Sequence, residues 1–173
     1  MRQLQNISEI KAIVLDVDGV LTDGRIGYHD NGNEIKFFHV RDGHGIVLAR
    51  RAGLRVGILS GRRSAANETR AAELKLDFLY QGCLDKKSGF EELLKAEGLT
   101  AAECMYIGDD LVDLPPMRCA GFAVAVGDGV PELDAVCHLR TTHPGGQGAV
   151  REAIEILLKG QGRWDDVTAR YMA

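Results

Sequence analysis

Short apolar runs alternate with longer amphipathic segments along the chain, a pattern typical of parallel strands separated by helices. The first run, 11–15, has no polar residue after Lys11, as expected of a strand buried on both faces. The pattern predicts an α/β fold, a Rossmann-like doubly wound parallel sheet with helices on both faces. Further strands are predicted at 54–59, 77–80, 104–107, 122–126 and 136–140. Helices are predicted at 44–52, 65–74 and 149–159. Two more helices are predicted, one that begins with a capping box at Ser88 and ends at Glu97, and one that runs from Pro115 towards Gly121.

Residues 24–40 break this alternation and predict a β-hairpin. Asn31-Gly32 lies in the turn between two alternating stretches, which is a strong short-range hairpin signal. After the last helix, residues 160–173 form a polar tail, so we expect one domain over residues 1–173 with a hairpin flap and a tail. The hairpin carries apolar side chains that should pack on another surface, such as a neighbouring subunit: Ile26, Tyr28, Ile35, Phe37 and Phe38.

Composition and charge narrow the class of protein. Of the 173 residues, 45% are hydrophobic and 27% charged, as is ordinary for a soluble globular protein. The net charge of −4 gives no indication of nucleic acid or an anionic membrane as a partner. No apolar run could span a bilayer, the polar N-terminus does not resemble a signal peptide, and the cysteines form no Cys-x-x-Cys pair. We therefore expect a cytoplasmic protein with reduced thiols.

Reactive side chains follow four of the predicted strands. Asp16 and Asp18 leave the first strand, and carboxylates this close repel each other unless a cation lies between them or one takes a proton. Taken alone, this Asp-x-Asp-Gly segment is also consistent with a simple turn. Because ligands of open α/β sheets bind beyond the carboxyl ends of the strands, the groups at these ends should meet at one edge. The other ends carry Ser60 and Gly61, Lys86, and the acids Asp109, Asp110 and Asp113.

Together these groups describe phosphoryl transfer through an aspartyl-phosphate. Carboxylates from two strands suit Mg²⁺, and Ser60 with the Gly61 amide, just ahead of a helix, forms an anion site. Lys86 adds a point charge for phosphate oxygens. In this scheme Asp16 attacks phosphorus, while Asp18 protonates the leaving alkoxide and later takes a proton from water.

Some assignments stay open on these residues alone. Lys87 competes with Lys86 for the phosphate. Asp110 and Asp113 either orient the lysine or a metal-bound water from outside the ligand set, or begin a helix where acidic residues suit the dipole. A loop role for Ser60 is a further alternative.

Four motifs in chain order resemble the haloacid dehalogenase superfamily of phosphatases. They are Asp16-Val17-Asp18-Gly19-Val20-Leu21-Thr22, Ser60, Lys86, and Gly108-Asp109-Asp110-x-x-Asp113. Further segments, including Ser60-Gly61-Arg62 and Gly145-Gly146-x-Gly148-Ala149-Val150, resemble the branch that hydrolyses 3-deoxy-D-manno-octulosonate 8-phosphate, and the likeness runs from about residue 13 to 159.

This resemblance implies more than the spacing does. It implies Mg²⁺ held by the side chains of Asp16 and Asp109 and the backbone carbonyl of Asp18. It also implies a fold without a cap domain, consistent with the short interval between Asp18 and Ser60. Finally, it implies a homotetramer in which the hairpins and C-terminal tails close the active sites of neighbouring subunits. The tail after Gly160 is poorly matched, as are His39 and His44.

The resemblance further implies that Arg62 and Arg70 face a sugar acid, whose carboxylate a guanidinium can grip in two places. Sialic-type nine-carbon sugar-acid phosphatases are similar but carry Glu at the position of Arg62, which favours the eight-carbon substrate of lipopolysaccharide core synthesis. The alternatives are such a nine-carbon phosphatase, or a non-catalytic oligomerising domain of a sugar-nucleotide enzyme.

Overall fold

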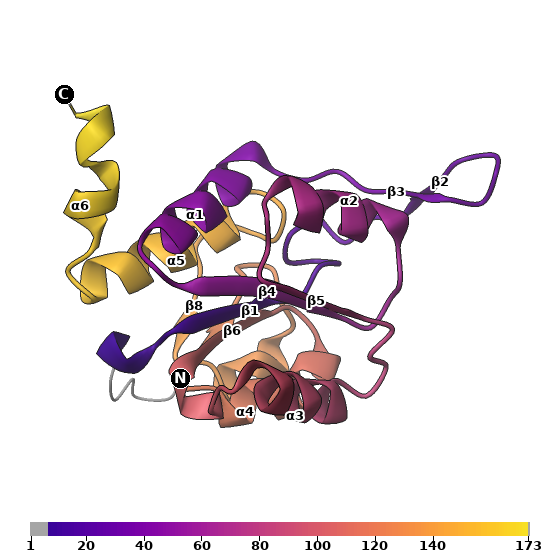
Figure 1. Cartoon of the computed structure of the whole chain (residues 1–173). Coiled ribbons are helices and arrows are strands. Elements are labelled where there is room, and N and C mark those ends of the chain that lie inside the picture. The colour runs from indigo at the N-terminus through magenta and orange to yellow at the C-terminus, as the bar shows by residue number, and fades with distance from the viewer. Residues whose placement is uncertain (1–6, 173) are drawn as a thin grey trace.

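A parallel sheet forms the centre of the protein in the computed structural model, which describes residues 7–172 (Figure 1). The strand order is β5-β4-β1-β6-β7-β8, and all of the pairings between these strands are parallel. The order reverses at β1, so a crevice is expected beyond its carboxyl end. The strands are β1 (Ala12–Leu15), β4 (Arg55–Ser60), β5 (Phe78–Gln81), β6 (Cys104–Gly108), β7 (Phe122–Ala125) and β8 (Leu139–Arg140).

Helices cover both faces of the sheet, which confirms the predicted doubly wound fold. Helices α1, α2 and α5 lie on one face and α3 and α4 on the other (Figure 1). Each layer has its own core, with Ile46 and Ile154 in one and Phe90 and Met117 in the other. The α-helices are α1 (Val40–Arg51), α2 (Ala65–Glu73), α3 (Lys86–Glu97), α4 (Leu114–Cys119), α5 (Ala149–Gly160) and α6 (Trp164–Thr168). Single 3₁₀ turns are η1 (Ile7–Glu9), η2 (Ala101–Glu103), η3 (Leu111–Asp113), η4 (Pro131–Ala135) and η5 (Ala169–Tyr171).

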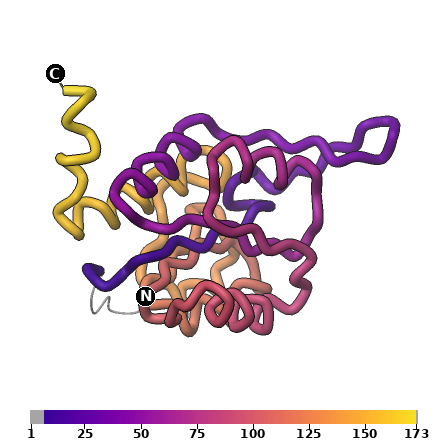
Figure 2. Tube along the Cα trace, viewed as in Figure 1, coloured from indigo at the N-terminus to yellow at the C-terminus, as the bar shows by residue number. Residues whose placement is uncertain are grey.

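The predicted hairpin is confirmed, although its strands are short. β2 (Gly27–Tyr28) pairs antiparallel with β3 (Glu34–Ile35), and the loop projects from the body on the side away from the C-terminal tail (Figure 2). Of its apolar side chains, Phe38 packs against the core of the same chain, whereas Phe37 is 80% and Tyr28 64% exposed.

Three sequence predictions were wrong in detail. Helix α1 begins at Val40, before the predicted residue 44, because Gly43 permits a close approach rather than breaking the helix: a Cβ there would lie 2.3 Å from Arg70 Nη2. Helix α3 begins at Lys86, because Asp85 caps it by accepting the Lys87 and Ser88 amides in place of the predicted cap at Ser88. Strand β8 is confined to Leu139–Arg140.

The tail was predicted only as a polar segment without an assigned helix, and it folds into α6 and η5. Val167 is 5% exposed and belongs to the same core cluster as Ile46 of α1 and Ile154 of α5. Tyr171 Oη lies 3.0 Å from His44 Nε2 on α1. Isolated apolar residues gave no periodic signal in so short a helix. Within residues 7–172, no helix combines the length and apolarity that crossing a bilayer requires.

Candidate active site

A cavity of about 190 Å³ lies at the carboxyl ends of the strands around β1. It brings together every predicted site residue except Arg70 and Asp113. The lining residues are Asp16, Asp18, Ser60, Gly61, Arg62, Lys86, Asp109, Asp110 and Val112. The convergence follows from parallel strands, whose carboxyl ends share one edge.

Lys86 lies between two carboxylates at the floor of this cavity. Its Nζ is 2.7 Å from Asp16 Oδ2 and 2.6 Å from Asp113 Oδ1, and its side chain is 3% exposed. Lys87, one residue later on α3, is 63% exposed and reaches Glu91. The Asp85 cap therefore begins α3 where Lys86, rather than Lys87, faces the acids.

Asp113 lies behind the cavity and organises it. Besides Lys86, it accepts hydrogen bonds from the Tyr106 hydroxyl at 2.8 Å and from the backbone amides of Asp109 at 3.0 Å and Asp110 at 3.3 Å. Asp110 accepts from the Leu111 amide at 2.7 Å and begins turn η3. Asp113 thus contacts the lysine and also forms the capping box of η3 together with Asp110.

The carboxylates of Asp16, Asp109 and Asp113 offer oxygens within 4.8 Å of one another. Burial, with the charge of Asp113 adding to it, raises the pKa of Asp16 to about 6 even though Lys86 opposes the shift. Burial and then the charges of Asp16 and Asp113 raise the pKa of Asp109 to about 8. Crowded carboxylates of this kind are relieved by a cation, and an all-oxygen set suits Mg²⁺. Because Asp113 is already occupied by four donors, Asp16 and Asp109 are the side chains that fit a metal.

Ser60 ends β4 and lines the cavity. Its side chain is buried, and its Oγ accepts from the Arg62 amide at 3.3 Å. Ser64 caps α2 by accepting from the Ala66 amide, so this donor of the helix N-terminus is already satisfied. Ser60, Gly61 and Arg62 are the residues of this segment that line the cavity.

The two predicted substrate arginines differ in position. Arg62 lines the cavity, with Nε 3.1 Å from Glu34 Oε1 and 3.9 Å from Asp18 Oδ2. Arg70 pairs with Glu73 at 2.8 Å and lies over the Phe38 ring, away from the cavity lining. A substrate role for either arginine stays a prediction.

Two charged hairpin residues at the site escaped the sequence reasoning. Lys36 Nζ lies 2.5 Å from Asp18 Oδ1, with its side chain fully buried, and 3.5 Å from Glu34 Oε2. Two-residue spacing places Glu34 and Lys36 on one face of a strand. That spacing was visible in the sequence, but it does not tell which face turns toward Asp18.

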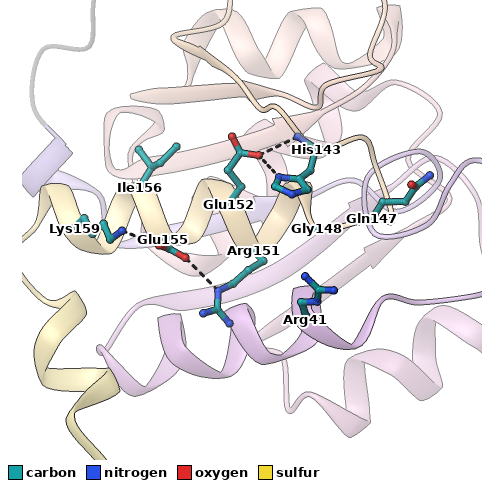
Figure 3. Close-up of a pocket in the computed structure, with 9 residues that line it drawn as sticks. All are labelled: Arg41, His143, Gln147, Gly148, Arg151, Glu152, Glu155, Ile156 and Lys159. Atoms are coloured by element: carbon teal, nitrogen blue, oxygen red, sulfur yellow. Dashed lines mark hydrogen bonds and ion pairs between the residues drawn. The ribbon is translucent and has the colours of Figure 1, made fainter. Parts of the chain in front are cut away.

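A larger depression of about 440 Å³ lies along α5 beside the start of α1 (Figure 3). Its acids contact neighbouring basic side chains: Glu155 lies 2.7 Å from Lys159 Nζ and 3.6 Å from Arg151 Nε, and Glu152 lies 2.7 Å from His143 Nδ1. The group of three carboxylates with oxygens within 4.8 Å of one another is at the smaller cavity, which is therefore the candidate active site.

Comparisons with known proteins agree with this geometry. Residues 40–121 match the family of haloacid dehalogenase-like hydrolases. The chain is 44% identical over 160 residues to the 3-deoxy-D-manno-octulosonate 8-phosphate phosphatase KdsC of Haemophilus influenzae, covering 92% of this chain and 88% of that one. The Escherichia coli K12 KdsC is 43% identical over 157 residues, covering 91% and 84%.

Solved structures give the same result. The Moraxella catarrhalis 3-deoxy-D-manno-octulosonate 8-phosphate phosphatase, in complex with a magnesium ion, a phosphate ion and a KDO molecule, is 41% identical with a TM-score of 0.91 and 95% coverage of both chains. A cobalt-bound Haemophilus influenzae phosphatase is 38% identical with a TM-score of 0.91, covering 98% of this chain and 100% of that one. The chain therefore belongs to the haloacid dehalogenase-like hydrolases, in the branch that contains the 3-deoxy-D-manno-octulosonate 8-phosphate phosphatases.

Proposed function

We propose that the protein hydrolyses 3-deoxy-D-manno-octulosonate 8-phosphate to the free sugar acid and phosphate, in the supply of lipopolysaccharide core sugar. The observation that carries the proposal is the grouping of buried Asp16 and Lys86 with half-buried Asp109, beside Asp18 at the end of β1. The names of the Haemophilus influenzae and Escherichia coli relatives specify this substrate, and the chain covers 88% and 84% of their length.

In the proposed reaction a carboxylate oxygen of Asp16 attacks phosphorus and the bond to the sugar oxygen breaks. Asp18 gives the departing alkoxide its proton. Asp18 then takes a proton from water, whose oxygen attacks the aspartyl-phosphate and releases phosphate and the free Asp16 carboxylate. Lys86 and the Ser60 hydroxyl bind the phosphoryl oxygens. Mg²⁺, held by Asp16, Asp109 and the Asp18 backbone carbonyl, would neutralise charge on the transferring group.

Substrate choice and assembly are part of the same proposal. Arg62, supported by its place in the cavity lining, and Arg70 are proposed to bind the sugar-acid portion. A single domain that assembles as a cytoplasmic homotetramer is supported by the apolar surface of the hairpin, where Tyr28 is 64% and Phe37 80% exposed.

A substrate panel tests the proposal. Phosphate release is measured from the eight-carbon 8-phosphate, a nine-carbon sugar-acid 9-phosphate and simple sugar phosphates, each with Mg²⁺ and with chelator. We expect the eight-carbon compound to have the highest kcat/KM, with Mg²⁺ required and Asp16→Asn inactive. Preference for the nine-carbon compound would overturn the substrate, and full activity of Asp16→Asn would overturn the nucleophile. Absence of any metal-dependent phosphate release would favour a non-catalytic domain.

A further inference from the structure

Lys36 is a fully buried cation that the proposed reaction does not use. Lysine is almost never fully buried unless it is paired, and its partner here is the proposed proton donor. Nζ lies 2.5 Å from Asp18 Oδ1, while the side chain of Asp18 is 20% exposed. The lysine comes from the chain just after β3, so the hairpin reaches into the site and contacts a reacting group.

Glu34 and Arg62 complete a closed ring of alternating charges with Asp18 and Lys36. Glu34 Oε2 lies 3.5 Å from Lys36 Nζ, and Glu34 Oε1 accepts from Arg62 Nε at 3.1 Å. Arg62 Nε in turn lies 3.9 Å from Asp18 Oδ2. Each carboxylate thus lies between two cations, and Glu34 holds both cations in place.

The ring treats the two oxygens of Asp18 differently. Oδ1 accepts a short hydrogen bond from Lys36. Oδ2 has Arg62 Nε 3.9 Å away, which is beyond hydrogen-bonding distance. A carboxylate held through one oxygen presents the other in a fixed direction, and proton transfer requires such alignment with the leaving oxygen.

We propose that Lys36 is a positioning residue for the phosphatase reaction, which binds Oδ1 of Asp18 so that Oδ2 faces the sugar oxygen of the substrate. Glu34 supports it by holding the ammonium from the other side. The inference rests on the proposed function, in which Asp18 is the proton donor. It also gives the flap a role within its own chain, because the hairpin sets the orientation of the acid.

Substrates with different leaving groups distinguish this positioning role of Lys36 from that of a purely structural ion pair. An alkoxide needs a proton as it departs, whereas 4-nitrophenolate departs readily without one. The value of kcat/KM reports the steps through phosphoryl transfer to Asp16. Loss of acid alignment should therefore lower kcat/KM for the sugar phosphate far more than for 4-nitrophenyl phosphate.

The variants are Lys36→Met, which keeps the length and removes the charge, and Lys36→Arg, which keeps the charge. We expect Lys36→Met to lose about 100-fold in kcat/KM on the sugar-acid phosphate, as for a displaced general acid, and much less on 4-nitrophenyl phosphate. Lys36→Arg should regain most of the loss, and Asp18→Asn should show the same dependence on leaving group. Lys95→Met, an exposed lysine on α3, is the matched control and should keep wild-type values.

An equal loss on both substrates, or no loss on either, would overturn the inference. If Lys36→Met does not fold, Glu34→Gln tests the same arrangement. We expect a smaller loss of kcat/KM, which is again greater for the sugar-acid phosphate than for 4-nitrophenyl phosphate. Failure of wild-type protein to hydrolyse the sugar-acid phosphate while it cleaves 4-nitrophenyl phosphate would instead refute the proposed substrate. In that case the kcat/KM values for 4-nitrophenyl phosphate are compared with those for an alkyl phosphate that the enzyme does cleave, in place of the sugar-acid phosphate.

Discussion

Lys86 donates a 2.6 Å hydrogen bond to Asp113, a carboxylate that has no exposed surface. The same carboxylate accepts from the Tyr106 hydroxyl and from the Asp109 amide. One buried anion therefore fixes both the cation of the site and the loop that presents Asp109. Its importance comes from these donors, since it does not line the cavity itself.

Asp113→Asn should damage stability and activity together. The amide keeps the volume but removes the charge that offsets Lys86, and loss of one partner of a buried pair costs about 3–5 kcal/mol. Denaturant unfolding measures the stability, and kcat with KM measures the activity. Tyr106→Phe is the matched control, because it removes one donor and should cost only about 1 kcal/mol. Wild-type behaviour of Asp113→Asn would contradict this account.

Gly19→Ala should impair metal binding specifically. A Cβ at Gly19 would lie 2.0 Å from Asp109 Oδ2, so the carboxylate must move. Gly32→Ala is matched for backbone strain, because φ is +90° at Gly19 and +82° at Gly32, but nothing lies within 4 Å of a Cβ at Gly32. We expect both variants to lose stability and Gly19→Ala alone to lose Mg²⁺ affinity by calorimetry. Equal Mg²⁺ affinities would show that the contact does not matter.

The sheet and most of the cavity could be predicted from the sequence because both follow from local signals. A buried strand such as 11–15 has no polar interruption, and a parallel sheet gathers strand ends without any knowledge of loop paths. Asp16, Asp18, Lys86 and Asp109 therefore converge as predicted.

What could not be predicted depends on contacts between segments far apart in the chain. Gly43 looks like a helix breaker until the Arg70 side chain is seen packed against it. Lys36 looks like an exposed hairpin residue until the hairpin is folded over Asp18. The short helix α6 forms where Val167 can be buried, and the local pattern of apolar residues does not predict it.

Val167→Ala tests whether the tail packs on its own chain in solution. Val167 is 5% exposed within the core, and loss of its two methyl groups should cost about 1–2 kcal/mol. Met172→Ala, at a position 79% exposed, should change the free energy of unfolding by less than about 0.5 kcal/mol. Indistinguishable unfolding midpoints for the two variants would mean that the tail is not docked as described.

Mg²⁺ affinity should rise with pH between about 6 and 8. Without metal, burial and neighbouring carboxylates raise the pKa of Asp109 to about 8 and that of Asp16 to about 6, so protons compete with the cation in this range. If one proton is displaced, the apparent affinity rises about tenfold per pH unit and levels off above the higher pKa.

The raised pKa of Asp109 also determines whether the stability of the metal-free protein rises or falls with pH. Because the pKa of Asp109 lies above its value of 3.8 in a model peptide, the folded state binds the proton more tightly than the unfolded state. The free energy of unfolding should therefore fall as pH rises from about 4 to 8, and Mg²⁺ should reverse that loss.

Calorimetric titration with Mg²⁺ at several pH values, in buffers of different ionisation enthalpy, measures both the affinity and the proton release. Glu103→Gln is a suitable control, because hydrogen bonding to Lys11 lowers the pKa of that carboxyl to about 2 and it does not titrate in this window. Asp109→Asn should lose both the affinity and the pH slope. An affinity that stays constant from pH 6 to 8 in the wild-type protein would show that Asp109 is already ionised, and that a compensating cation already lies close to the carboxylates in the folded chain.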